Sequence, residues 1–133
     1  AAAASSLDER EKFIEVVDEE AESVASMRDE TEALLGRLGD LDRTPLSERD
    51  FDALLALYEE LSSLRERLEE LVAARQETIS HHRRALSALV PDVTEFFYAD
   101  LSVQYPVLAT LAEVGATLDT ATSRVERRLA ATP

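Results

Sequence analysis

The chain has 133 residues, of which 28 are acidic and 14 basic, for a net charge of −14, and it contains no cysteine. This length predicts one domain spanning residues 1–133, and a hydrophobic content of 45% argues against an unfolded chain. The absence of cysteine excludes disulfides and thiolate metal sites.

The basic residues are almost all arginine, because Lys12 is the only lysine. An acid excess combined with arginine is typical of proteins from salt-loving archaea, and an ordinary acidic protein of a GC-rich organism is the alternative. At molar salt the Debye length is only about 3 Å. We therefore interpret the acidic surface as a source of hydration and solubility, not as a signal for a partner.

The sequence has no apolar run of about 18 residues and so predicts no transmembrane helix. Its opening, AAAASS, lacks the charged start and the long apolar core of a signal peptide. We expect a cytoplasmic protein, and whether residues 1–4 are native stays open.

The first helix is predicted at about residues 6–38. Ser6 and Glu9 have the spacing of a capping box, and Gly39 is expected to end the helix as its C′ residue. Apolar side chains separated by sums of three and four residues are predicted to form the inward face. These are Leu7, Ile14, Val17, Ala21, Val24, Leu35 and Leu38, with Phe13, Met27 and Leu34 widening the stripe.

Residues 39–47 form the predicted linker, and a second helix is predicted at about 48–89. Its start is left open between Thr44 followed by Pro45 and Ser47 followed by Asp50, since both pairs suit a helix N-terminus. The helix should end before Pro91, because the residue before a proline disfavours the helical conformation.

The second helix carries the strongest periodic signal in the chain. Six leucines repeat at intervals of three and four residues, as in the a and d positions of a coiled-coil seam. They are Leu54, Leu57, Leu61, Leu64, Leu68 and Leu71. The same spacing continues to Arg75, Thr78 and His82, so we expect the seam to fail there. The apolar side is expected to shift to the adjacent track of Val72, Ile79 and Leu86.

After Pro91 a short aromatic helical segment is predicted at 91–101, followed by a third long helix at about 105–130 with Pro106 in its first turn. The third helix has one apolar face, made by Leu108, Leu111, Val114, Leu118, Ala121, Val125 and Leu129. Three long helices with short connections predict an all-α fold. The expected architecture is an antiparallel up-down-up three-helix bundle or coiled coil, with the short aromatic helix between the second and third helices.

A metal site is the first chemistry to consider. Glu77 lies four residues before His81, and the only other histidine is His82. Carboxylate-bridged di-metal bundles use a Glu-x-x-His spacing twice, whereas the spacing here is one residue longer and occurs once. We therefore predict no metal site and interpret His82 as a partly buried polar residue.

Paired carboxylates are the second chemistry to consider, because they can act as general acid and base. Glu15, Glu19 and Glu22 are the candidates, but they fall on the predicted exposed face of an acidic helix. No Ser-His-Asp set and no glycine-rich phosphate loop is present. The sequence thus predicts no catalytic residue, no cofactor and no enzymatic activity.

Two arginine clusters could contact phosphate groups. Arg83 and Arg84 belong to the second helix, whereas Arg124, Arg127 and Arg128 belong to the third. An up-down-up bundle separates the clusters to opposite ends, and arginine near a helix C-terminus is already favoured by the helix dipole. We do not expect direct nucleic-acid binding, and whether either cluster binds anything stays open.

Large aromatic side chains gather in EFFYADLSVQYP, residues 95–106. They could cap one end of the core, form a partner surface or line a ligand pocket, and their place between two long helices favours the cap. Phe97 and Leu101, four residues apart, are expected to point inward together. Phe96, Tyr98 and Tyr105 are the candidates for an interaction surface.

The stretch FFYADLSVQYPVLATLAEV, followed by a helix ending RRLA, resembles the closing region of an uncharacterised family of haloarchaeal all-helical proteins. The resemblance is carried by Phe97, Tyr98, Asp100, Leu101, Tyr105, Pro106, Val107 and Leu108. It covers about the C-terminal quarter of the chain, whereas the first 90 residues match by helical character alone. That family has no assigned activity, so the resemblance implies a source organism and a helical fold but no catalytic residue.

Together these features predict a non-enzymatic helical protein that works by protein–protein contact or as a structural element. Its partner would be a second copy, through the helical faces, or an unidentified protein. The alternative function is a transcriptional or DNA-associated accessory factor.

Overall fold

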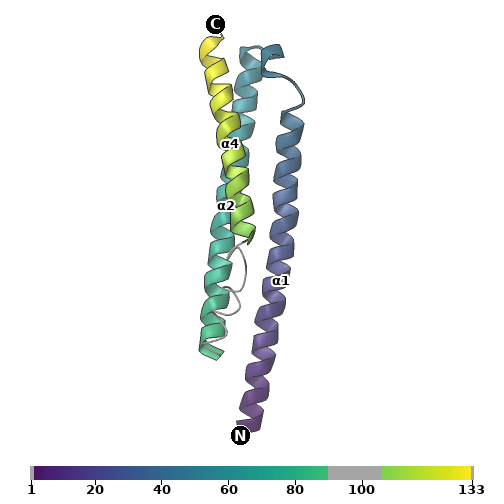
Figure 1. The fold of residues 1–133 in the computed structure, drawn as a ribbon, viewed down its shortest axis with the longest axis vertical. Coiled ribbons are helices and arrows are strands. Elements are labelled where there is room, and N and C mark those ends of the chain that lie inside the picture. The colour runs from purple at the N-terminus through teal and green to yellow at the C-terminus, as the bar shows by residue number, and fades with distance from the viewer. Residues whose placement is uncertain (1, 90–105, 133) are drawn as a thin grey trace.

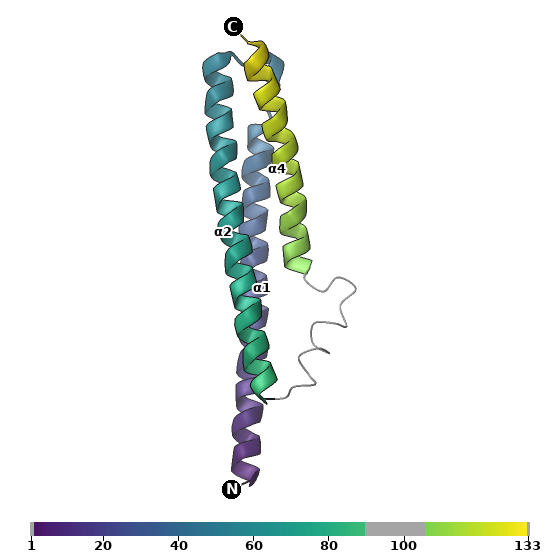
Figure 2. The same ribbon diagram turned by 90° about the vertical axis from the view of Figure 1, so that its left-hand side faces the viewer.

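The computed structural model describes residues 2–89 and 106–132, which form three long α-helices and one short 3₁₀ turn. The helices are α1 (Ala2–Leu41), α2 (Phe51–Leu89) and α4 (Pro106–Ala131), and the turn is η1 (Leu46–Glu48). They run up, down and up side by side (Figures 1 and 2), and the described residues contain no strand. The predicted all-α three-helix bundle is confirmed, whereas the predicted aromatic helix at 91–101 lies outside the described residues.

The end of α1 differs from the sequence prediction. The helix begins at Ala2, ahead of the predicted start at Ser6, and continues through Gly39 to Leu41. No glycine in the described residues has a positive φ, so Gly39 is not a left-handed C′ residue. The free carbonyl of Leu41 instead accepts a hydrogen bond of 2.8 Å from Arg49 Nη2, and Arg49 Nε donates to the carbonyl of Thr44 at 3.3 Å. One side chain from beyond the linker therefore satisfies the end of α1.

The start of α2 also differs from both predicted alternatives. Pro45 precedes the 3₁₀ turn η1, and the long helix begins only at Phe51. Asp50 is the N-cap, because its Oδ1 accepts a hydrogen bond of 2.8 Å from the backbone N–H of Ala53. At the C-terminal side, α4 begins at Pro106, where a missing N–H costs no helical hydrogen bond.

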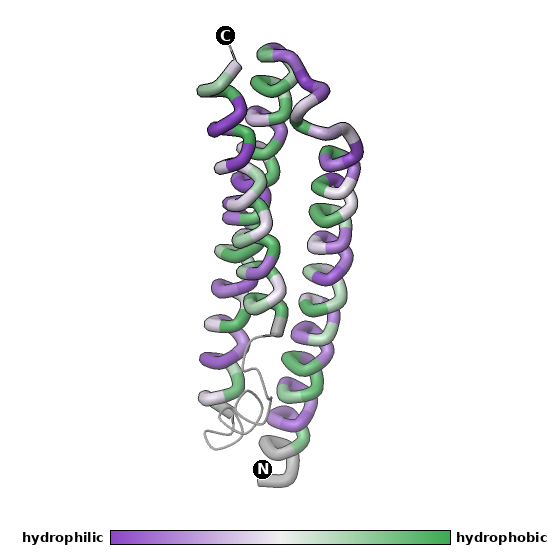
Figure 3. The backbone as a smooth tube through the Cα atoms, turned by 45° about the horizontal axis from the view of Figure 1, so that its top comes forward, coloured by the Kyte–Doolittle hydropathy of each residue, from purple (hydrophilic) through white to green (hydrophobic). Residues whose placement is uncertain are grey.

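The core lies along the line where the three helices meet. All six leucines of the predicted seam are buried, with side-chain exposures of 5% or less. From α4 they meet buried Leu111, Val114, Leu118 and Val125, and α1 contributes Leu34. Hydrophobic and hydrophilic segments alternate along each helix (Figure 3), which is the pattern of an amphipathic bundle.

Helix α4 is shorter than the other two, with 26 residues against 40 in α1 and 39 in α2. It therefore accompanies α1 and α2 only over the half of the bundle that contains the linker (Figure 2). In that half α2 and α4 approach closely at Gly115, where a Cβ would lie 3.3 Å from both Arg65 Nη1 and Leu68 Cδ2. Arg65 also forms a salt bridge with Asp119 of α4.

Candidate functional site

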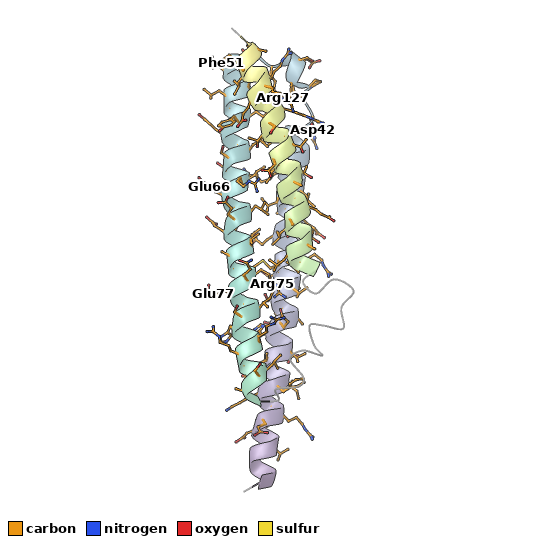
Figure 4. All side chains as sticks on the ribbon, turned by 60° about the vertical axis from the view of Figure 1, so that its left-hand side comes forward. Asp42, Phe51, Glu66, Arg75, Glu77 and Arg127 are labelled. Carbon is orange, nitrogen blue, oxygen red and sulfur yellow. The ribbon has the colours of Figure 1, made fainter. Side chains whose placement is uncertain are left out.

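A buried polar cluster joins α1 and α2 beyond the last leucine of the seam. Arg75 is 5% exposed and His82 is 3% exposed, and both face Glu20 of α1, which is also buried. Figure 4 shows Arg75 between the helices, whereas Glu77 lies on the outer side of α2. The apolar seam ends at Arg75, as expected, but Arg75 and His82 of the same track stay buried and only Thr78 between them is half-buried.

The contacts within this cluster are charge-assisted. The Arg75 guanidinium pairs with Glu20 Oε1, and its Nη1 also donates to Ser23 Oγ at 3.0 Å. His82 Nδ1 lies 3.3 Å from Glu20 Oε2, and its Nε2 lies 3.5 Å from Glu19 Oε2. His82 is thus fully buried between two carboxylates and not partly buried as predicted. Arg75 Nε is buried with no hydrogen-bond partner among the described residues.

This cluster resembles a structural ion pair more than a reaction centre. The carboxylate and the guanidinium face each other across a helix interface, and the three surface pockets along α1, α2 and α4 are lined by other residues. The predicted apolar track of Val72, Ile79 and Leu86 lies beside it, with Ile79 and Leu86 buried. Carboxylate and guanidinium therefore complete the core between the two helices.

The other candidates for chemistry lie on the surface. Glu77 and His81 are exposed on α2, and Glu15 and Glu22 are exposed on α1. In the described part of the chain, no group of three or more histidine, aspartate or glutamate side chains could hold a metal ion. Nor is any helix there long and apolar enough to cross a membrane.

A shifted pKa is found on the surface of the bundle, at Arg67. Arg67 of α2 has a pKa above its ordinary value, first because its side chain hydrogen-bonds Glu30 of α1 and then because it hydrogen-bonds Glu70. Its Nη2 and Nη1 donate to these carboxylates at 3.0 Å each. Arg67 is fully solvated, so these contacts align α1 with α2 but contribute little to stability.

The outer edge of α1 is where the structure departs most from the predicted apolar face. Leu7, Ile14 and Leu35 were predicted to point inward, yet they are 58%, 52% and 45% exposed. The buried residues of α1 are Leu34, which was predicted to point inward, and Glu20 and Thr31, which were not. Three large apolar side chains are therefore left on the solvent side of one helix edge.

An open apolar groove lies at the linker end, close to Leu35. It has a volume of about 540 Å³ and lies between the end of α1, the linker and the C-terminal half of α4. Its apolar lining includes Leu38, Leu57 and Ala121. Leu35 and Gly39 of α1 also line it, so Leu35 belongs both to the groove and to the outer edge of α1.

The arginine clusters lie at opposite ends of the bundle, as predicted. Arg83 and Arg84 lie near the end of α2, and Arg124, Arg127 and Arg128 lie near the end of α4, at the linker side (Figure 1). All five are exposed. The predicted interaction surface, Phe96, Tyr98 and Tyr105, lies outside the described residues, as do Phe97 and Leu101.

Sequence reasoning missed Glu20 and Arg75 as a pair. The signal was present, because Glu20 lies three residues after Val17 and four before Val24, on the side of the helix that carries its apolar residues. Arg75 likewise continues the leucine track of α2. An acid and a base at core positions of adjacent antiparallel helices predict a buried ion pair.

By its fold, the molecule is an acidic bundle of three α-helices with a buried ion cluster and an apolar outer edge on α1. The chain belongs to the family described as a domain of unknown function (DUF7260), whose sequence model matches residues 1–122. This match includes the first 90 residues, which the sequence analysis related to a family only by helical character. No curated protein and no solved structure matches the chain.

Proposed function

We propose that this chain is a non-enzymatic protein that acts by contact with another protein surface, either a second copy or a different chain. The observation that carries the proposal is the exposure of Leu7, Ile14 and Leu35 on one edge of α1. Burial of each such side chain would contribute about 1.5–3 kcal/mol relative to leaving it in water. A line of them on one edge is more informative than the same residues scattered singly.

The buried cluster supports the absence of an enzymatic role. Glu20, Arg75 and His82 are the titratable groups that the described residues enclose together, and they satisfy one another across a helix interface. A catalytic carboxylate or imidazole needs access to a substrate. We therefore assign this cluster to the fold.

The composition supports a halophilic, cytoplasmic setting for the same function. With a net charge of −14, the folded chain repels itself when salt is removed. The helical circular dichroism signal is then expected to fall between about 2 M KCl and dilute buffer. An unchanged signal in dilute buffer would contradict the halophilic setting and leave the protein-contact proposal intact.

A DNA-associated role is the second candidate, and the observation that favours it is the exposed cluster of Arg124, Arg127 and Arg128. These three side chains lie at one end of a strongly acidic molecule, which makes the candidate the weaker one. Retardation of duplex DNA that is lost on replacing the three arginines with glutamine would support it. Equal mobility of DNA with and without the protein at low and high salt would remove it.

The protein-contact proposal is tested by replacing the exposed edge with glutamine, which keeps the helix propensity close to that of leucine. We expect Leu7→Gln combined with Ile14→Gln to lose proteins that co-purify with the wild-type chain, or to change the mass measured by light scattering. Leu55→Gln is the matched control, because Leu55 is an exposed leucine of α2. Identical masses and identical co-purified proteins for all three chains would refute the proposal.

A further inference from the structure

We propose that the outer edge of α1 binds a basic amphipathic helix from another protein. This inference rests on the proposed function and specifies the chemistry of the partner. We define the outer edge by residues that share one side of α1: Leu7, Ile14, Ala21, Leu35, Gly36 and Gly39. A helix is the expected partner because the edge is long and narrow, and because its apolar residues recur along the axis of α1.

The spacing of the apolar residues fits a helical partner. Leu7, Ile14, Ala21 and Leu35 occupy positions separated by multiples of seven residues, which is the repeat of helices that pack along their length, and the exposed Arg28 holds the remaining position of this repeat. From Leu7 to Leu35 the edge extends about 42 Å at 1.5 Å per residue. A compact ligand would use only part of this length, whereas a partner helix of about 29 residues can contact all of it.

The two glycines of the edge have no explanation within this chain. A Cβ at Gly36 or Gly39 would find no heavy atom within 4 Å, and neither residue has a positive φ. Alanine would therefore fit both positions and is the better helix former. Gly115 is different, because a Cβ there would press on Arg65 and Leu68. Gly115 lets α2 and α4 approach closely within the bundle. We infer that Gly36 and Gly39 allow the backbone of a partner protein to approach α1 in the same way.

Although molar salt screens the acidic surface at long range, the carboxylates that a docked helix would touch directly favour a basic partner. Between Leu7 and Glu32 the sequence holds eleven acidic and three basic residues. The carboxylates beside the edge are exposed and form no salt bridge within the part of the chain that the structure describes. They are Asp8, Glu11, Glu15, Asp18, Glu22 and Asp29.

This charge also argues against the other occupants. A second copy would bring a second acidic flank against the first, and nucleic acid would bring phosphate, so both would be repelled. Lysine or arginine on both sides of an apolar stripe would pair with the unpaired carboxylates instead. The groove at the linker end, which Leu35 and Gly39 line, would receive the apolar side chains at one end of the partner helix.

The test uses two synthetic helical peptides of about 33 residues, long enough to extend from Leu7 to Gly39, with the same leucine stripe, one with lysine on both flanks and one with glutamate. Binding to the full chain is measured by fluorescence anisotropy at the lowest KCl concentration that preserves its helical signal. We expect the lysine peptide to bind and the glutamate peptide not to bind. Leu7→Gln with Ile14→Gln should weaken binding at least tenfold, whereas the control Leu55→Gln should not.

The glycines provide the decisive readout. Gly36→Ala combined with Gly39→Ala is expected to raise the unfolding temperature of the free chain. The same variant is expected to bind the lysine peptide at least tenfold more weakly. A change that stabilises the free protein but weakens binding separates a docking surface from a folding defect. Unaltered binding by this variant would overturn the close approach that we infer.

Two further results would overturn the inference. Equal binding of the lysine peptide to all variants would show non-specific charge attraction. No binding of the lysine peptide would exclude a basic helix as the occupant, and the mass by light scattering then decides the broader proposal. A wild-type dimer that Leu7→Gln with Ile14→Gln dissociates would leave the proposed function standing with a second copy as the partner.

Discussion

Between Leu54 and Leu71, α2 meets its neighbours with leucine, whereas between Arg75 and His82 the same track meets α1 with charge. The six leucines, Arg75 and His82 are all buried, whereas Thr78 between Arg75 and His82 is half-buried. We call the part of the core around Leu54–Leu71 the leucine layer, and the part around Arg75 and His82 the ion layer. In the leucine layer α4 is the third helix, and it supplies Leu111 and Leu118. In the ion layer the guanidinium of Arg75 and the imidazole of His82 converge on one carboxylate of α1.

This comparison shows that two different factors determine whether a residue of α2 is buried and whether a buried residue of α2 can be polar. Geometry decides which residues of α2 face inward, since the spacing of three and four continues without interruption. The neighbouring helix decides which chemistry is tolerated there. A guanidinium is accepted at the position of Arg75 because Glu20 and Ser23 lie opposite it.

The largest effect is expected when one partner of the buried ion pair between Glu20 and Arg75 is removed. Arg75→Leu removes the guanidinium that faces the buried Glu20 carboxylate, and removing one partner of a buried ion pair costs about 3–5 kcal/mol of the free energy of unfolding. Urea denaturation followed by circular dichroism measures the loss. A loss below about 1 kcal/mol would mean that Glu20 reaches solvent when its partner is removed.

The control for this prediction removes both charges. Glu20→Leu combined with Arg75→Leu is expected to recover most of the lost stability, because an apolar pair of similar volume is often neutral relative to a buried ion pair. The difference between the double variant and the sum of the two single variants gives their coupling energy.

The leucine layer should lose stability by a different mechanism. Leu61→Ala or Leu64→Ala creates a cavity and is expected to cost about 2–5 kcal/mol, since both side chains are almost fully buried. Leu55→Ala, on the exposed side of α2, should cost less than about 1 kcal/mol. Similar losses at all three leucines would contradict the inward face assigned to α2.

A smaller effect is expected at His82, where a hydrogen bond is lost but the ion pair remains. His82→Leu should cost about 1–3 kcal/mol in the same denaturation experiment, because the imidazole contacts to Glu20 and Glu19 disappear. Glu19→Gln is the matched control, since Glu19 is exposed and should change stability by less than about 0.5 kcal/mol. Equal effects of the two changes would place His82 at the surface.

The smallest effects concern the glycines and test how tightly the leucine layer is packed. Gly36→Ala and Gly39→Ala should each stabilise the chain by up to about 1 kcal/mol, because alanine favours the helix and meets no neighbour. Gly115→Ala should stabilise less or destabilise, since Arg65 and Leu68 must move. The unfolding temperatures of the three variants give the ranking, and an equal gain at Gly115 would mean that α2 and α4 separate easily there.

The sequence predicted the fold through its strongest regularity. Six leucines at coiled-coil spacing located the inward face of α2, and the face of α4 was equally legible in Leu111, Val114 and Leu118. The inward face of α1 was predicted in part, because Leu34 and Met27 do pack on the core, whereas Leu7, Ile14 and Leu35 do not. Hydrophobicity alone does not distinguish a side chain that packs inside the chain from one left for another surface.

The candidate site was harder to predict for a related reason. When one helix is considered alone, glutamate and arginine are both predicted to lie on the surface, because charged side chains are rarely buried. Their burial follows from the antiparallel alignment that brings Glu20 opposite Arg75, and this alignment is a property of the folded pair. The end of α1 was missed similarly, since Arg49 satisfies it from the far side of the linker.

The ion layer has a consequence for how the helices choose their alignment. Leucine seams repeat themselves, so a slide of α1 along α2 by seven residues would again place leucine against apolar side chains. The same slide would separate Glu20 from Arg75 by about 10 Å along the helix axis and leave two opposite charges buried apart. The polar cluster therefore specifies one register of α1 against α2, much as a single buried polar residue specifies the register of a coiled coil.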